Sequence, residues 1–364
     1  MRAAIYSPYL DTFGGGEKYM MTIAEILSGD NRVDILLDQH LQELGADYLK
    51  DTLSKRFSLN LQKIAFINAP IGKQSSVVLR ALFLKNYDVF VYLTDGSIFY
   101  PTAKKNILHI QSPLIGQPSK SAWGKFKLKG WDLIIYNSKF TEEHSKENWV
   151  LPSRVIYPPV DTFKIKPLKK KEYILSVGRF FGYLKNKKQE ILIQIFKELF
   201  EAGKINGWSL HLVGSAGEGD KEYLRELQDL AKGIPIKFYP NLAYNDLVKL
   251  YGESSIYWHA SGFEETDPTK MEHFGIATVE AMAGGCVPIV IQKGGQIEII
   301  EDKISGYLWN TLNECKKLTV KVIRDEYLRS KLSENAVKRS KNFNKDKFIE
   351  NILRVSHLTK QIKD

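Results

Sequence analysis

Lys270-Met-Glu-His-Phe-Gly-Ile-Ala-Thr-Val-Glu-Ala-Met-Ala-Gly-Gly-Cys-Val-Pro-Ile-Val290 is the stretch that decides the fold of this chain. It places two carboxylates, Glu272 and Glu280, eight residues apart across a loop that opens into a helix. Residues 274–276 fall at the predicted helix start, where free backbone N–H groups and the positive end of the helix dipole favour an anion. Two glycines end the helix, and the apolar run 286–291 predicts a buried parallel strand. The stretch therefore puts an acceptor of hydroxyl hydrogen bonds beside a phosphate cradle, although an ordinary strand–helix–strand unit with surface glutamates has the same spacing.

Outward from this stretch, short apolar runs alternate with amphipathic segments, which is the pattern of βαβ units. The expected strands are 3–7, 33–37, 89–92, 107–110, 133–137, 173–177, 209–213, 236–239, 256–259 and 287–291. The expected helices are 16–27, 188–202, 222–231, 244–252, 278–283 and a C-terminal one within 346–362. Two such sheets in series predict an α/β chain of two Rossmann-like domains, residues 1–160 and 161–345. Their join is expected within residues 157–171, whose prolines and lysines are typical of a linker.

A glycine-rich motif, Thr12-Phe-Gly-Gly-Gly-Glu-Lys18, follows the first expected strand and opens a helix. Because Gly14, Gly15 and Gly16 carry no side chains, backbone N–H groups there can approach a ligand closely. The motif is neither G-x-G-x-x-G nor a P-loop, and this disfavours a dinucleotide enzyme. A tight turn without a ligand is the alternative.

Basic residues follow the first expected strand of the second domain. Ser176-Val-Gly-Arg179 closes that strand, and Lys185 comes six residues after Arg179. A guanidinium can bind a phosphate through two parallel hydrogen bonds, and a lysine adds a mobile point charge. Together they are expected to neutralise a departing diphosphate. Solvated surface cations are the alternative, and Lys187 and Lys188 are close enough in sequence to substitute for Lys185.

Polar residues also end strands of the first domain. His109 lies at the C-terminal end of an expected strand, the edge at which open α/β sheets bind ligands, although a hydrogen-bonded core histidine is the alternative. Ser138 is expected to cap the next helix, with Asn137 lining the site. His259 and His273 suggest a metal, but no carboxylate or thiol spacing completes a zinc set, so no metal is expected.

Length and composition exclude several classes of protein. A chain of 364 residues exceeds what one core usually supports, which agrees with two domains. No apolar run reaches the roughly 20 residues that span a bilayer, no secretory signal is apparent, and two cysteines predict no structural disulfide, so a cytoplasmic protein is expected. The net charge of +10 is spread over both halves and suits nucleic acid, anionic lipid or phosphorylated substrates equally. No nucleic-acid module is recognisable, and no specific nucleic-acid binding is expected.

Residues 118–131 interleave four lysines with Trp123, Phe126, Leu128 and Trp131. Such a mixture can lie at a bilayer interface, where the lysines meet anionic head groups and the aromatic rings enter below them. A helix that packs its aromatic rings inward and keeps its lysines in water is the alternative. The interfacial interpretation predicts peripheral membrane contact through residues 118–131 and a lipid-linked substrate.

Glu272-His-Phe-Gly275, followed by Glu280-Ala-Met-Ala-Gly-Gly285, resembles the E-x7-E signature of retaining glycosyltransferases of family 4, the glycosyl transferases group 1. Further motifs follow in the family's order over most of the chain. The family usually has glycine in the second place of this motif. The variant with histidine there, His273 in this chain, is similar to the motif of the mannosyltransferases that extend lipid-linked oligosaccharides and of bacterial relatives. The resemblance implies the GT-B fold, in which two Rossmann-like domains face each other across a cleft and a C-terminal helix, here 346–364, crosses back onto the first domain.

The resemblance also implies roles for the motifs. Arg179, Lys185 and the amides of residues 274–276 would stabilise the leaving diphosphate, while Glu272 would position sugar hydroxyls and Glu280 those of the ribose. His109 would lie near the transferred sugar. The donor-binding residues implied besides Glu280 are Gly14, Gly15, Gly16, Asn137, His273, Phe274, Gly275 and Ile276, with Asn241 and Leu242 in the loop that holds the nucleobase.

The predicted function is therefore the transfer of a hexose, with retention of configuration, from a nucleotide diphosphate sugar to a hydroxyl of a glycan or lipid-linked glycan. No cofactor is expected; GDP-mannose is the first donor expected from the resemblance, and UDP-glucose and UDP-N-acetylglucosamine come next. Two alternatives stay open. One is a nucleotide-sugar 2-epimerase on the same scaffold, and the other is a bilobal binding protein without turnover.

Overall fold

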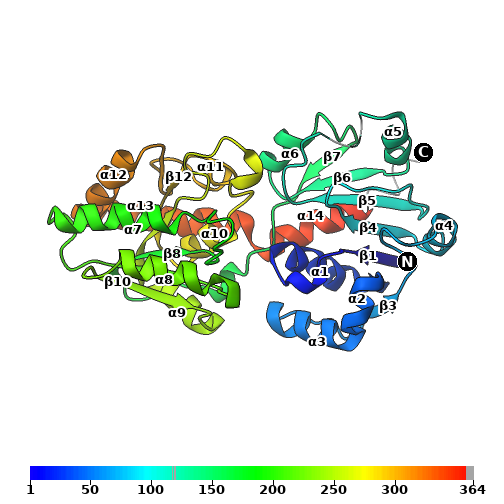
Figure 1. Ribbon diagram of the computed structural model, residues 1–364, viewed down its shortest axis with the longest axis horizontal. Helices are drawn as coiled ribbons and strands as arrows, with labels where there is room; N and C mark the ends of the chain where they lie inside the picture. The colour runs from blue at the N-terminus through cyan, green and yellow to red at the C-terminus, as the bar shows by residue number, and fades with distance from the viewer. Residues whose placement is uncertain (117, 119, 358–364) are drawn as a thin grey trace. The chain divides into compact units, whose positions relative to one another are not determined.

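The computed structural model describes residues 1–116, 118 and 120–357, and it divides the chain into two compact units (Figure 1). The N-terminal unit comprises residues 1–159 together with the segment that begins at Asp346, and the C-terminal unit comprises residues 160–345. Each unit is a parallel β-sheet covered by helices, so each has its own core.

The sheet of the N-terminal unit has seven strands in the order β3-β2-β1-β4-β5-β6-β7, and every neighbouring pair is parallel. The strand order reverses between β1 and β4, and the carboxyl ends of strands beside such a switch point are where open α/β sheets bind ligands. The strands are β1 (Arg2–Tyr6), β2 (Arg32–Leu37), β3 (Ala65–Asn68), β4 (Val89–Leu93), β5 (Lys105–Ile110), β6 (Leu133–Tyr136) and β7 (Ser153–Val155).

The helices of this unit include one from the far end of the chain. In α14 the ring of Phe348 meets the ring of Tyr19 edge-on at 4.8 Å, and the carbonyl of Val355 accepts a hydrogen bond from Lys105 Nζ at 2.7 Å. The helices are α1 (Gly15–Leu27), α2 (Gln39–Leu44), α3 (Ala46–Phe57), α4 (Val77–Leu84), α5 (Ala122–Leu128), α6 (Lys139–Ser145) and α14 (Lys345–His357). Of the C-terminal segment predicted as helix, residues 358–364 lie outside the described residues.

The C-terminal unit repeats the arrangement with six parallel strands in the order β10-β9-β8-β11-β12-β13, which places its switch point between β8 and β11. Its strands are β8 (Lys171–Val177), β9 (Ser209–Gly214), β10 (Ile236–Pro240), β11 (Ser254–His259), β12 (Val287–Ile291) and β13 (Tyr307–Trp309). Its helices are α7 (Gln189–Glu201), α8 (Lys221–Leu230), α9 (Tyr244–Glu253), α10 (Ile276–Ala283), α11 (Gln296–Ile299), α12 (Leu312–Arg324) and α13 (Glu326–Ser340).

The central strands are almost wholly apolar because helices cover both faces of each sheet. All five residues of β4 and all five of β12 are buried. Alternate residues of β1 enter different cores, with Ala3 and Ile5 in one cluster and Ala4 and Tyr6 in another. The two clusters lie on opposite faces of the sheet, so burial on both sides fixes the register of the strands.

The expected strands and helices are all present, with ends that differ by a few residues. The short strands β3, β7 and β13 were not predicted; each stands at or next to a sheet edge and has only three or four residues. Within 118–131, where Ser119 lies outside the described residues, the apolar side chains divide between two environments. Leu128 and Trp131 are buried, whereas Trp123 and Phe126 are 65% and 47% exposed.

Candidate functional site

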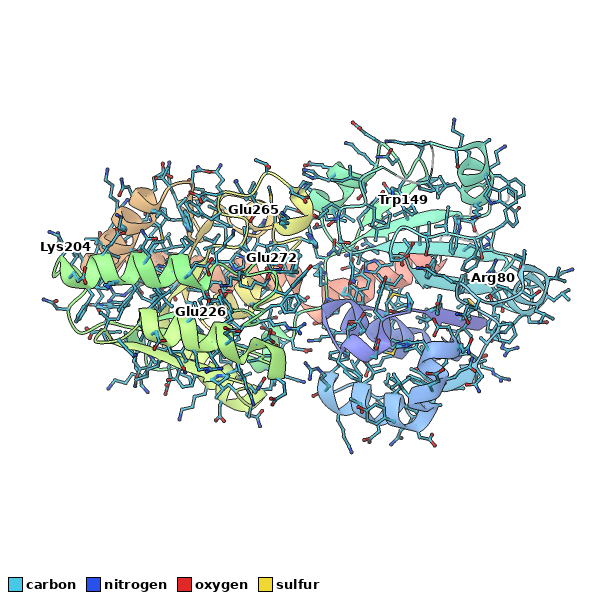
Figure 2. All side chains as sticks on the ribbon, in the orientation of Figure 1. Arg80, Trp149, Lys204, Glu226, Glu265 and Glu272 are labelled. Atoms are coloured by element: carbon cyan, nitrogen blue, oxygen red, sulfur yellow. The ribbon has the colours of Figure 1, made fainter. Side chains whose placement is uncertain are left out.

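Glu272 lies at the centre of a charged group in the C-terminal unit, on the loop between β11 and α10 (Figure 2). Its Oε2 accepts a hydrogen bond from Lys187 Nζ at 2.7 Å and lies 3.5 Å from His259 Nε2. Burial acts to raise the pKa of Glu272, but the charges of Lys187, His259 and His273 and the hydrogen bond from Lys187 together outweigh it and lower the pKa to about 2. Glu272 is therefore a carboxylate at neutral pH, able to accept hydrogen bonds and unable to donate a proton.

His259 is the last residue of β11, and its side chain is 5% exposed. Burial lowers its pKa to about 4, although Glu272 acts in the opposite direction. The ring is thus neutral at physiological pH, and its contact with Glu272 is not an ion pair there. Among the described residues its Nε2 is buried beside the carboxylate and has no hydrogen-bond partner.

A glycine pair after β12 holds the backbone of the Glu272 loop in place. Gly295 N–H donates to the carbonyl of Glu272 at 2.7 Å. A Cβ on Gly294 would overlap that carbonyl, and one on Gly295 would overlap the backbone of Phe274. Only residues without side chains allow the two loops to pack this closely. The sequence analysis missed this pair, although a Gly-Gly dipeptide directly after a predicted strand is a recognisable signal of close backbone approach.

The expected helix start is at α10, where Gly275 is the residue before the first turn and has φ of +120°. A Cβ on Gly275 would also come within 2.6 Å of the amide nitrogen of Gln296. Phe274 packs into the core, and His273 Nε2 lies 3.2 Å from the Thr269 carbonyl. The backbone N–H groups of the first turn of α10, which begins with Ile276, thus follow directly on a loop whose conformation requires glycine at position 275.

Glu280 follows one turn into α10, and its Oε2 accepts a hydrogen bond from the buried Tyr251 hydroxyl at 2.9 Å. This contact fixes one carboxylate oxygen. Glu272 and Glu280 are therefore held by different partners, the first by a cation and the second by a hydroxyl.

The basic residues after β8 separate into two groups. Arg179 is exposed, and its guanidinium lies 4.4 Å from the centroid of the Phe181 ring. Lys185, the lysine that the sequence analysis singled out, points instead to Glu226 of α8 at 2.7 Å, and both side chains are about half exposed. Lys187 is the lysine that reaches Glu272, and Lys188 Nζ lies 2.7 Å from Glu265 of the same loop region.

Asn241 and Leu242 lie in the turn between β10 and α9. Asn241 adopts φ of +56°, and its side chain bonds both backbone groups of Ala216, accepting at 3.0 Å and donating at 2.9 Å. It therefore joins the loops that follow two neighbouring strands. Leu242 is partly exposed directly after it, at the carboxyl edge of the same sheet that carries Arg179 and His259.

In the N-terminal unit the three glycines stand at the start of α1. Glu17 Oε2 accepts from Gly14 N–H and from the Thr12 hydroxyl, both at 2.8 Å, which closes the loop onto the helix. Gly15 is the first helical residue. A Cβ on Gly16 would overlap the side chain of Gln111, so the absence of a side chain there permits a close helix–strand contact.

Gln111 connects Gly16 to another predicted residue, because its carbonyl accepts a hydrogen bond from Asn137 Nδ2 at 2.8 Å. Ser138 caps α6 as expected, accepting from Thr141 N–H at 3.0 Å. Gly16, Gln111 and Asn137 therefore meet at the carboxyl edge of the sheet, and Gln111 is a site candidate that the sequence analysis did not name.

His109 is wholly buried, stacked on the Tyr19 ring at 4.0 Å, with Nδ1 3.0 Å from the Ile135 carbonyl. Burial lowers its pKa to about 4. Its Nε2 has no hydrogen-bond partner among the described residues. The position of the ring agrees with a core histidine, one of whose nitrogens makes no hydrogen bond. A role for His109 beside the transferred sugar stays a prediction.

Residues 1–116, 118 and 120–357 contain no group of three or more histidine, cysteine or acidic side chains placed to hold a metal ion. None of their helices combines the length and the apolar character needed to cross a membrane.

Residues 160–339 match the protein family described as "Glycosyl transferases group 1". The chain is also 30% identical over 209 residues to the GDP-Man:Man(3)GlcNAc(2)-PP-Dol alpha-1,2-mannosyltransferase of Xenopus laevis. That match covers 50% of this chain and 40% of the relative, so the chain spans less than half the length of this relative.

Solved structures resemble the whole chain. A glycosyltransferase from Rickettsia africae superposes with a TM-score of 0.77 at 17% identity, over 100% of this chain and 99% of the other. HepE of Anabaena, solved in complex with UDP-glucose, has a TM-score of 0.67 at 18% identity, over 98% and 99%. With the two parallel sheets, these likenesses show that the chain has the GT-B fold.

Proposed function

We propose that this protein transfers a hexose from a nucleotide diphosphate sugar to a hydroxyl acceptor. The proposal starts from residues 160–339, which belong to the glycosyl transferases group 1 family. The acceptor is a glycan or a lipid-linked glycan. The observation that carries the proposal is the group around Glu272, where a carboxylate, a lysine and a neutral histidine meet at the switch point of the sheet.

In this proposal the donor diphosphate lies over the first turn of α10. Its negative charge increases as the glycosidic bond breaks, so cations and helix N–H groups placed there stabilise the transition state more than the bound donor. Arg179 is free to turn from Phe181 toward a phosphate, and Lys187 supplies the second charge in the role first expected of Lys185. A bidentate guanidinium contact suits the diphosphate geometry.

Glu272 and His259 bind the hexose in this scheme. The carboxylate accepts hydrogen bonds from sugar hydroxyls, and the unused His259 nitrogen takes part in one more. Because the pKa of Glu272 is about 2, this residue is a positioning group for the sugar and not a general acid. Glu280 accepts from the ribose, and the loop of Asn241 and Leu242 contacts the nucleobase.

We further propose that configuration is retained and that no metal takes part. The leaving diphosphate removes the proton of the incoming hydroxyl on the same face of the sugar, while Arg179 and Lys187 compensate its charge. The likeness of part of the chain to a mannosyltransferase that uses GDP-Man supports GDP-mannose as the donor, and HepE bound to UDP-glucose supports a UDP-sugar second. The exposed Trp123 and Phe126 support peripheral contact with the membrane from a cytoplasmic protein.

The test is to incubate the purified protein with a panel of GDP- and UDP-sugars, without acceptor, and to follow nucleotide release and sugar products by mass spectrometry. Slow release from one donor is expected, reduced on the order of a hundredfold in Arg179→Ala. An isomerised sugar would favour an epimerase instead. A donor could also raise the thermal stability of the protein without turnover, even when acceptor glycans are added. That result would favour a binding protein.

Two additions test the finer proposals. With an acceptor present, NMR of the product should show the anomeric configuration of the donor sugar, and an inverted product would contradict retention. Turnover should persist in EDTA; a loss in EDTA that Mn²⁺ restores would contradict the metal-independent mechanism.

A further inference from the structure

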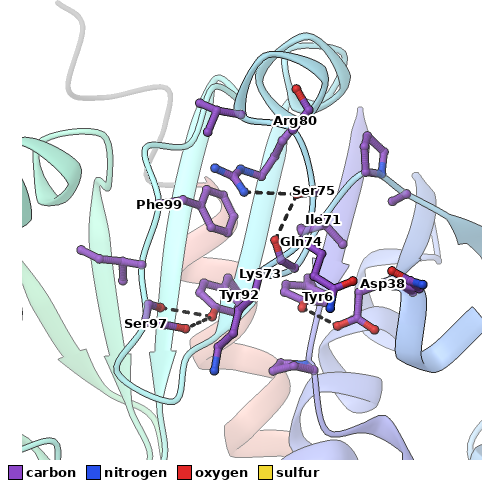
Figure 3. Close-up of a pocket in the computed structure, with 18 of the residues that line it drawn as sticks. Tyr6, Asp38, Ile71, Lys73, Gln74, Ser75, Arg80, Tyr92, Ser97 and Phe99 are labelled. Atoms are coloured by element: carbon purple, nitrogen blue, oxygen red, sulfur yellow. Dashed lines mark hydrogen bonds between the residues drawn. The ribbon is translucent and has the colours of Figure 1, made fainter.

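A cavity of about 1310 Å³ opens in the N-terminal unit at the carboxyl ends of four strands (Figure 3). Tyr6 ends β1, while Asp38 and Asp95 follow β2 and β4. Small-molecule sites typically have roughly 300–1,000 Å³, so this cavity can hold a ligand of several rings. Its other walls come from α4 and α5.

Arg80 lies in this cavity although it is only 9% exposed. Figure 3 shows its guanidinium against the ring of Phe99, whose centroid is 4.3 Å from Cζ, and Nη1 donates to the Ser75 hydroxyl at 3.2 Å. A guanidinium has five N–H donors, and one hydrogen bond leaves most of them unused. Within the described part of the chain, no carboxylate forms an ion pair with Arg80.

Three acids also line the cavity, Asp38, Asp95 and the exposed Glu43, and the first two have hydrogen-bond partners of their own. Asp38 accepts from the Tyr6 hydroxyl at 2.8 Å and from Leu41 N–H at 3.1 Å, while Asp95 accepts from Ser97 N–H at 2.9 Å. Burial lowers the pKa of Arg80; the phenols of Tyr92 and Tyr6 act in the opposite direction, and no carboxylate does. An uncompensated buried cation is costly for the fold, and a ring contact offsets only a part of that cost.

We propose that this cavity binds the acceptor through a phosphoryl group held by Arg80. The inference rests on the proposed function for its premise that an acceptor exists. The guanidinium offers its unused N–H donors to the phosphoryl oxygens, and the exposed Lys73 adds charge at the same wall. Ser76, the N-cap of α4, also lines this wall, so the positive end of the helix lies at the cavity.

The remaining walls suit what a phosphoryl group would carry. Asp38 and Asp95 have further acceptor capacity for sugar hydroxyls. Val77 and Leu79, which are 69% and 59% exposed, line the cavity beside Arg80 and can cover an apolar chain. Of the acceptor, the structure assigns only the phosphoryl group. The experiment distinguishes free phosphate from a phosphoryl group attached to an apolar chain.

The experiment is calorimetric titration of the full-length protein with octyl phosphate below its micelle concentration, with GDP and UDP both present in excess to occupy the donor site. Octyl phosphate is expected to bind, and Arg80→Gln to weaken it roughly tenfold. Arg80→Lys, which keeps the charge and loses the planar fork, should fall between. The matched control is Lys85→Gln, an exposed lysine just after the same helix and outside the cavity, which should bind as the wild type does.

Two parallel titrations use inorganic phosphate and octyl glucoside. Binding of inorganic phosphate that depends on Arg80 means that the phosphoryl group suffices, and binding of octyl phosphate alone means that the chain contributes. Equal affinity in wild type and Arg80→Gln, or octyl glucoside binding as tightly as octyl phosphate, would overturn the proposal. If Arg80→Gln does not fold, Lys73→Gln takes its place, and unchanged octyl phosphate affinity in that variant overturns the proposal.

The two levels of inference fail separately. Absence of any GDP, UDP or nucleotide-sugar binding contradicts the proposed function, whatever octyl phosphate does. Normal donor hydrolysis with no Arg80-dependent anion binding contradicts only the acceptor proposal.

Discussion

Glu272 and Lys187 form the contact that contributes most to keeping Glu272 ionised. Burial alone would favour the neutral acid, yet the lysine at 2.7 Å, together with His259 and His273, lowers the pKa of Glu272 to about 2. Lys185 is two residues away in sequence and contacts an exposed glutamate on α8. The two lysines therefore offer a matched pair for mutation.

Replacement of Lys187 by alanine should destabilise the fold by about 1–3 kcal/mol, because it leaves a largely buried carboxylate without its cation. Lys185→Ala should cost less than about 1 kcal/mol, since exposed ion pairs contribute little. Urea unfolding of both variants checks this. Equal costs would contradict the assignment of Lys187 as the partner that the site requires.

Acid should weaken the fold through Glu272. Because the folded-state pKa is lowered to about 2, the ionised group stabilises the native state above its ordinary pKa of roughly 4.3, and this stabilisation is lost as the pH falls toward 2. The difference in unfolding free energy between wild type and Glu272→Gln should thus be constant above about pH 5 and shrink below it. In a Lys187→Ala background the shrinkage should be smaller, because Lys187 contributes most to the lowered pKa; an unchanged shrinkage would contradict that role.

The sequence alone could not show that Lys187, and not Lys185, contacts Glu272. Arg179 follows β8, and Glu272 and Glu280 lie before and within α10, as strand and helix periodicity predicted. Lys185 and Lys188 have φ of +43° and +54°, a backbone path that non-glycine residues rarely take. This path turns Lys187 toward Glu272, and nothing in the residue types indicates it.

At the scale of elements, the loop after β12 supports the loop that carries Glu272. Gly294 has φ of +63°, and a side chain there would overlap the Glu272 carbonyl. Gly203, just after α7, has φ of +64° but nothing within 4 Å of its added Cβ. The two glycines share a backbone conformation and differ in packing.

Gly203→Ala should therefore cost only the left-handed strain, roughly 1–2 kcal/mol. Gly294→Ala adds the overlap and should cost roughly 2–5 kcal/mol in unfolding free energy, with weaker donor binding as well. Thermal unfolding and donor titration of both variants measure this. A Gly294→Ala protein as stable as Gly203→Ala would show that the two loops do not depend on each other.

Helix α5 carries the proposed membrane contact. Trp123→Ser and Phe126→Ser should each reduce co-sedimentation with vesicles that contain anionic lipid, because each removes exposed aromatic surface beside lysines. Tyr327 on α13 is 80% exposed, and Tyr327→Ser is the control. If all three variants sediment alike, or if neutral vesicles bind as well as anionic ones, α5 is not the contact.

Buried central strands were predicted, whereas the short edge strands and the helices α3, α12 and α13 were not. β4 and β12 are continuous apolar runs, which a strand covered on both faces requires. β7 has three residues, none of them buried, so no periodicity identifies it. The start of α10 falls within residues 274–276, as expected, whereas the positive φ of Gly275 was not predicted.

At the scale of the whole molecule, the two units share a strand order but not a sequence match. The family match covers residues 160–339, within the C-terminal unit, while the structural likeness extends over the whole chain. The cavity of the N-terminal unit could not be predicted, because Asp38, Arg80 and Trp123 come from separate segments that only the fold brings together. Residues that select the acceptor are expected in that unit, and the residues that hold the donor diphosphate in the other.

The central claim is that the C-terminal unit holds the donor through its diphosphate. The most direct measurement is the crystal structure of the protein with GDP-mannose or UDP-glucose, whichever donor it hydrolyses. The account predicts the diphosphate at the first turn of α10, in contact with Arg179 and Lys187, and the hexose hydroxyls on Glu272. A nucleotide seated in the N-terminal unit, or a diphosphate held without either cation, would contradict it.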